Sequence, residues 1–147
     1  MKPKYGDYLK YWRVIRYFFR QKYNLSQADL EMLLFLYSEP YFSQDKFIEF
    51  NELLSWDKDR FKRLVRDGWI VVFRKRVGKH KGLYELSFKA KKMVTEIYKK
   101  LNGEEIPSSN RNNPLFLRKV SYTDKVYRNM IKEMNDTIRQ SKRQTLE

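Results

Sequence analysis

The sequence contains no cysteine, a single histidine and no long apolar run. Without cysteine neither a disulfide framework nor a thiolate metal site can form, and one histidine cannot build a cluster of imidazole ligands. No apolar stretch reaches the roughly 20 residues that span a bilayer, and the opening MKPKYGDYLKYW lacks the apolar core of a signal peptide. We therefore expect no membrane partner, no metal and no cofactor, and a cytoplasmic protein.

The sequence also lacks the short motifs that mark common enzyme sites. Neither G-x-G-x-x-G after a strand nor G-x-x-x-x-G-K-[ST] occurs. Glu49 and Glu52 lie three residues apart on an expected helix, as paired carboxylates can, but no further polar group converges on them. The chain is therefore not expected to be an enzyme.

Acidic residues are few beside basic ones, and the basic excess is concentrated in one segment. The 147 residues hold 32 Lys or Arg and 18 Asp or Glu, a net charge of +14. Residues 55–82 contain ten Lys or Arg and three Asp, whereas residues 26–54 contain one Lys and six acidic residues. Focused positive charge is typical of nucleic-acid binders. A solvated basic surface with no partner is the alternative that composition leaves open.

Hydrophobic periodicity predicts a mostly helical chain with one β-hairpin. The order matches a winged helix-turn-helix whose N- and C-terminal helices serve dimerisation. The expected domains are residues 1–103 for DNA binding, 104–122 as a linker, and 123–147 as a C-terminal helix for dimerisation. The expected helices cover residues 7–23, the segment from Ser26 to just before Pro40, 44–54, 57–67, 88–103 and about 123–139, with strands at 69–74 and 83–88.

Several helix ends can be assigned from residue types. Ser26 with Asp29 three residues later reads as a capping box, and Ser55 and Ser87 are expected N-caps. Gly68 fits the left-handed residue that ends a helix. In the helix expected over 44–54, the apolar residues are expected to point mostly inward; they are Phe47, Ile48, Phe50, Leu53 and Leu54.

The helix expected over 57–67 has a basic face. At 100° per residue, Phe61, Leu64 and Val65 form its apolar side and cations the opposite side. In the major groove, Arg63 would pair with a guanine edge, and Lys62 or Arg66 with phosphates. The hairpin would clamp the neighbouring backbone. The candidate DNA-binding residues are Lys58, Arg60, Lys62, Arg63 and Arg66 on the helix, and Arg74, Lys75, Arg76, Lys79, His80 and Lys81 on the hairpin.

Three consecutive stretches resemble the MarR family of transcriptional regulators: 63-RLVRDGWIVV-72, 74-RKRVGKHKG-82 and 83-LYELSFKAKKMV-94. They follow the family order of a recognition helix, a charged wing and the opening of the next helix. Ser87 stands for the usual Thr, Ala90 for the usual Gly, and the wing lacks the acidic member of the family's Asp-x-Arg pair. The resemblance covers about residues 7–103. It implies a winged-helix fold, homodimerisation through the terminal helices and sequence-specific binding to a palindromic duplex.

The last expected helix carries an apolar stripe, and a breaker-rich segment precedes it. Because residues 104–122 read as a flexible connection, the stripe is expected to pack against a second copy of the chain. Its members are Tyr127, Met130, Ile131, Met134 and Ile138.

The sequence thus predicts a homodimeric, double-stranded DNA-binding transcriptional regulator in a bacterial or phage-infected cell. Two alternatives stay open. One is a non-catalytic structural protein of a viral particle or nucleoid that touches DNA or protein without sequence choice; the other is an adaptor whose basic face meets an acidic protein. Two alanines among many Lys, Tyr, Phe and Asn indicate an AT-rich coding genome, as phages often have. The operator, any effector and the direction of regulation stay open.

Overall fold

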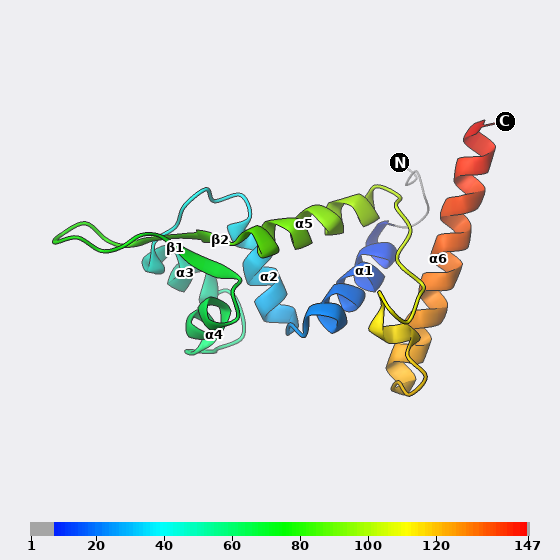
Figure 1. Ribbon diagram of the computed structural model, residues 1–147, viewed down its shortest axis with the longest axis horizontal. Coiled ribbons are helices and arrows are strands. Elements are labelled where there is room, and N and C mark those ends of the chain that lie inside the picture. Colours follow the sequence, from blue (N-terminus) through cyan, green and yellow to red (C-terminus); the bar gives the residue numbers. More distant parts are fainter. Residues whose placement is uncertain (1–7, 147) are drawn as a thin grey trace. The chain divides into compact units, whose positions relative to one another are not determined.

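The computed structural model describes residues 8–146, and the side chains up to residue 144 (Figure 1). The chain divides into two compact units. Unit 2 is Ser26–Thr95, and unit 1 combines the described residues up to Leu25 with those from Glu96 onward. This division differs from the expected boundaries, because the first helix groups with the C-terminal part of the chain. The expected helix start at residue 7 lies outside the described residues.

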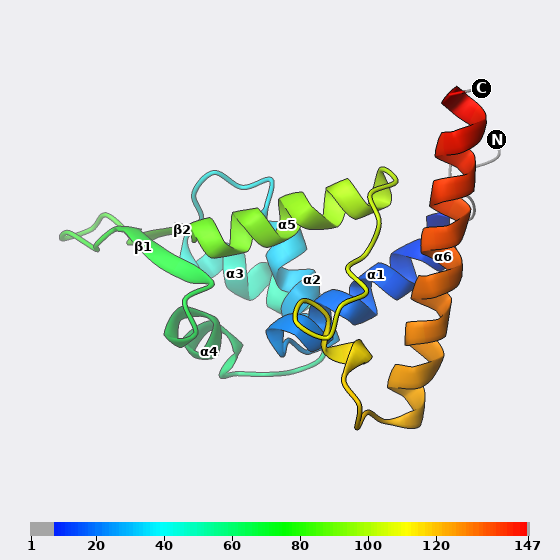
Figure 2. The ribbon, with the colours of Figure 1, turned by 45° about the vertical axis from the view of Figure 1, so that its right-hand side comes forward.

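Unit 2 has the element order of a winged helix. Its two strands are antiparallel, with Ile70 opposite Leu86 and a register shift between Val72 and Arg74. Both ribbon views show the hairpin extending beyond the helices of its own unit (Figures 1 and 2). The elements are α2 (Gln27–Leu36), α3 (Gln44–Asn51), α4 (Arg60–Arg66), β1 (Ile70–Arg74), β2 (Leu83–Leu86) and the first half of α5 (Phe88–Leu101).

Most of the predicted helix ends in unit 2 are confirmed, but only the Ser26 half of the predicted capping box forms, because the Asp29 carboxylate accepts from Arg60 and Arg63. The Ser26 hydroxyl accepts a hydrogen bond from the Asp29 amide at 3.0 Å, and Ser87 accepts one from the Ala90 amide at 3.2 Å. Gly68 ends α4 with a φ of +80°. The prediction for Ser55 is wrong: α4 begins only at Arg60, its N-cap is Asp59, and no side chain caps it.

The predicted inward face of α3 is only partly correct. Phe47 is buried, but Ile48 is 48% exposed and Leu53 is 72% exposed. The helix has eight residues and ends at Asn51, so Leu53 lies outside it. A helix of two turns buries one narrow stripe, and here Phe47 occupies that stripe.

Unit 1 contains α1 (Tyr8–Tyr23), the second half of α5, a 3₁₀ turn η1 (Pro114–Phe116) and α6 (Tyr122–Leu146). α1 packs against both α6 and η1, and η1 packs against α6. α1 buries four apolar side chains, which are Val14, Ile15, Phe18 and Phe19.

Most of the apolar stripe of α6 is covered within unit 1: three of its five residues are buried, and Tyr127 and Met130 are half-buried. Ile131, Met134 and Ile138 are at most 2% exposed in the single chain. The segment 104–122 is not a flexible connection, since Ile106 is buried and the Asn135 side chain bonds both its backbone N–H and its C=O, at 3.0 and 2.9 Å. The stripe therefore does not require a second copy to cover it.

Tyr17 of α1 contacts two residues of α6. The Tyr17 ring stacks on Tyr127 with centroids 3.9 Å apart, and its hydroxyl donates to the Asp124 carboxylate. Burial, followed by this hydrogen bond, raises the pKa of Tyr17 to about 12.

Within residues 8–146, no helix has the length and apolar character that crossing a membrane requires.

Candidate nucleic-acid interface

Helix α4 is held by aromatic packing on one side. Leu64 is buried, and the Phe61 ring meets the rings of Phe47 and Tyr84 edge-on, each with centroids 5.0 Å apart. Val65, expected on this apolar side, is 36% exposed. Arg60 takes the buried place instead, so the helix is rotated relative to the sequence-based expectation.

Arg60 is a structural residue. Its side chain is 2% exposed, and its Nε donates to Asp29 Oδ1 at 2.9 Å. The Ser55 carbonyl and hydroxyl accept from Nη1 and Nη2 at 3.1 and 3.3 Å, and Asn51 Oδ1 also accepts from Nη1. With its donors satisfied in the interior, Arg60 does not lie on the surface, and its expected role in contacting DNA does not fit this position.

The side chain of Arg63 is only partly buried. Its Nε donates to Asp29 Oδ2 at 3.0 Å, and its Nη2 donates to Asp29 Oδ1 and to Asp57 Oδ2, both at 2.8 Å. The side chain is 30% exposed. These bonds, first to Asp29 and then to Asp57, raise the pKa of Arg63, and the bond from Arg63 lowers the pKa of Asp57. Three of its five N–H donors are committed, which leaves those on Nη1 for a ligand.

The other cations of this region are exposed. Lys58 and Lys62 have no acidic partner within ion-pair distance among residues 8–146. Arg66 is 71% exposed and donates to Asp67 Oδ1 at 3.1 Å, which lowers the pKa of Asp67. The exposed surface of α4 and its preceding turn is therefore basic, through Lys58, Lys62 and Arg66.

The wing is fixed at its root to the segment just before and at the start of α3. The Phe42 and Tyr84 backbones exchange two hydrogen bonds, at 2.9 and 2.8 Å. Tyr41 stacks on Phe73 with centroids 3.9 Å apart. Together these contacts make the root of the hairpin a defined surface.

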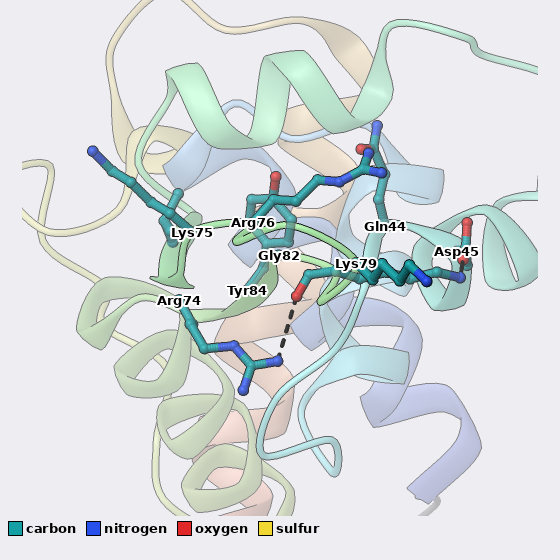
Figure 3. Close-up of a pocket in the computed structure, with 10 residues that line it drawn as sticks. Gln44, Asp45, Arg74, Lys75, Arg76, Lys79, Gly82 and Tyr84 are labelled. Carbon is teal, nitrogen blue, oxygen red and sulfur yellow. Dashed lines mark hydrogen bonds and ion pairs between the residues drawn. The ribbon is translucent and has the colours of Figure 1, made fainter.

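All the expected wing cations and His80 are exposed, and the hairpin tip turns at Gly78, whose φ is +57°. Lys75, Arg76 and Lys79 have no acidic partner among the described residues, whereas Lys81 forms an ion pair with Asp45 at the start of α3. A hollow of about 380 Å³ opens between the wing and α3 (Figure 3). Its lining is Gln44, Asp45, Val72, Arg74, Lys75, Arg76, Lys79, Lys81, Gly82 and Tyr84.

Three residues have contacts or exposure that the sequence did not predict. Asp29 and Asp45 hold cations of α4 and the wing, and Trp56, in the turn before α4, is 83% exposed. The opposite net charges of residues 26–54 and 55–82 could have indicated that these segments pair. No sequence signal marks Trp56. In residues 8–146, no group of three or more His, Cys, Asp or Glu side chains is placed to hold a metal ion.

No protein-family model matches the sequence. A search of curated proteins finds no match either. A solved structure described as disulfide-formed AbfR is similar over 90% of this chain and 85% of that one, with 14% sequence identity and a TM-score of 0.44. A likeness at this level supports no conclusion about function.

Proposed function

We propose that this protein is a MarR-like transcriptional regulator that binds double-stranded DNA, with α4 in the major groove and the wing on the adjacent backbone. One observation carries the proposal: unit 2 exposes cations on α4, on the turn before it and on the wing that lack acidic partners among the described residues. These are Lys58, Lys62, Lys75, Arg76 and Lys79.

The physical reason is counterion release. A phosphate neutralised by a protein cation frees condensed counterions, and log K then falls with log salt by about 0.9 per contact. Five such cations in one protomer would give a slope of roughly 4 to 5 if every one of them meets a phosphate. An exposed ion pair is weak, so Arg66 exchanges Asp67 for a DNA acceptor at little cost.

We assign base reading to Arg66, with a smaller part for Arg63. Arg66 is the most exposed arginine of α4, and a guanidinium forms two hydrogen bonds to a guanine edge. Arg63 offers only its Nη1 group while Asp29 and Asp57 hold the rest of its side chain. The expectation that Arg63 is the main reader is therefore replaced.

Selection of bound duplexes from a random pool, followed by sequencing, tests the proposal. A regulator enriches one motif. A salt titration on the enriched and a scrambled duplex then tests the wing, by replacing Arg76, Lys79 and Lys81 with Gln. Binding to both duplexes should weaken by similar factors, and the salt slope should flatten by up to about 2.7 per protomer.

A second candidate is a non-catalytic DNA-binding protein of a viral particle or nucleoid. The holding of Arg63 by two aspartates favours it, because the fully exposed cations are then mostly lysines, which serve phosphates better than base edges. Salt-sensitive binding with no enriched motif would select this candidate over the regulator. Absence of binding to any duplex would refute both and leave an acidic protein partner.

A regulator that reads a palindrome must also be a dimer. Since the α6 stripe is covered within unit 1, the interface has to use other apolar residues. Near the start of α6, Leu117 is 46%, Tyr122 82% and Val126 38% exposed. Tyr122 and Val126 lie four residues apart and so share one face of the helix.

A further inference from the structure

We propose that the hollow at the root of the wing is a seat for a single phosphate group, and that Asp45 is its built-in competitor. The inference rests on the proposed function for the source of that phosphate, a DNA backbone, but the seat itself is defined by its chemistry. A free nucleotide carries the same group.

The walls of the hollow are anchored to each other. The Phe42–Tyr84 backbone pair and the Tyr41–Phe73 ring stack join the segment before α3 to the wing. A Cβ on Gly82 would lie 3.4 Å from the Arg74 carbonyl oxygen, so the two arms of the hairpin lie close together there. A fixed hollow loses little conformational freedom when it binds a ligand.

The lining is strongly positive. Five of its residues are Lys or Arg, and Asp45 is its one carboxylate. In Figure 3 the Arg76 side chain extends toward Gln44, whereas the Lys75 side chain points to the opposite side. The start of α3 also faces the hollow through Gln44 and Asp45, and a helix N-terminus favours negative charge. An anion with several acceptor oxygens matches these donors, and a phosphate group has them.

Asp45 occupies this site in the absence of a ligand. Its carboxylate pairs with Lys81, and the two side chains are 63% and 69% exposed. Exposed ion pairs are weak, so a phosphate can take over Lys81. Asp45 then faces the incoming anion at short range and weakens its binding. The wild-type affinity is therefore set partly by this one carboxylate.

The test is Asp45→Asn, with Glu49→Gln as the matched control. Both substitutions remove one negative charge from α3, but Glu49 pairs with Lys46 and does not line the hollow. Binding to a fluorescent 20-bp duplex is measured by anisotropy across a salt series. Asp45→Asn should tighten binding by up to about eightfold at 0.1 M salt and steepen the salt slope by up to about 0.9 per protomer. Glu49→Gln should do neither.

A second arm uses adenosine 5′-monophosphate, titrated into ¹⁵N-labelled protein. Backbone amide shifts should centre on Gln44, Arg76 and Lys79, and the dissociation constant should fall for Asp45→Asn but not for Glu49→Gln. This pattern without duplex binding would keep the seat and reject the DNA-binding function.

Other outcomes overturn the seat. Duplex binding that is unchanged by Asp45→Asn, or tightened equally by Glu49→Gln, would refute it while leaving DNA binding intact. Nucleotide-induced shifts that are scattered over the surface, or that are absent near the hollow, would also refute it.

Discussion

Asp29 should contribute strongly to the stability of unit 2. Its side chain is 6% exposed, and its carboxylate accepts three hydrogen bonds from two arginines of α4. Asp29→Ala would leave the Arg60 guanidinium, 2% exposed, without its counter-charge. Removing one partner of a buried ion pair costs about 3–5 kcal/mol.

The expected loss of unfolding free energy is large relative to the total stability of a domain. A domain of this size has a total stability of about 5–15 kcal/mol, and urea slopes for small proteins are about 1–3 kcal/mol per M. The urea midpoint of Asp29→Ala should therefore fall by about 2 M. Asp29→Asn keeps the shape and one acceptor oxygen, so its midpoint should lie between those of Asp29→Ala and the wild type.

Urea unfolding followed by circular dichroism and tryptophan fluorescence measures these midpoints. Glu31→Gln is the control, because it removes the same charge from α2, and the Glu31 carboxylate accepts an exposed hydrogen bond from Gln27. The control should shift the midpoint by less than about 0.5 M. An Asp29→Ala midpoint as close to the wild type as that of the control would refute the network as the anchor of α4.

Three further outcomes follow from the site and the units. Arg66→Ala should weaken binding to a selected duplex by about 1–3 kcal/mol without lowering the melting temperature, whereas Arg63→Ala should lower the melting temperature; equal melting temperatures would contradict the assigned roles. Arg63 lowers the folded-state pKa of Asp57. The stabilisation from this pair is therefore fully present above the pKa of Asp57 in the unfolded chain, and it is lost as the pH falls through the folded-state pKa. Asp57→Asn should accordingly reduce the acid dependence of unfolding below about pH 4. Light scattering should give twice the 18.2 kDa chain mass, and Tyr122→Ser with Val126→Ser should return the monomer mass; a wild-type monomer would exclude the dimer.

Local signals in the sequence determined the element order. Ser26 and Ser87 have side chains that satisfy amides within three residues, and Gly68 accepts the positive φ that ends α4. A run of β-branched and aromatic residues, 69-WIVVF-73, then a glycine-containing turn and a returning run, 83-LYELSF-88, specified the hairpin. These caps and turns depend on residues that are neighbours along the chain, so the local sequence is enough to predict them.

The tertiary structure decided which charges are available. Arg60 and Arg66 are alike in the sequence, yet one is 2% and the other 71% exposed. The difference comes from Asp29, 31 residues before Arg60, and helical periodicity contains no information about a partner that distant. The same holds for the α6 stripe: its apolar pattern showed that something must cover it, but only the fold shows that unit 1 does so itself. The sequence pattern determines which side chains have to be buried or paired, and the tertiary structure determines which residues bury them or pair with them.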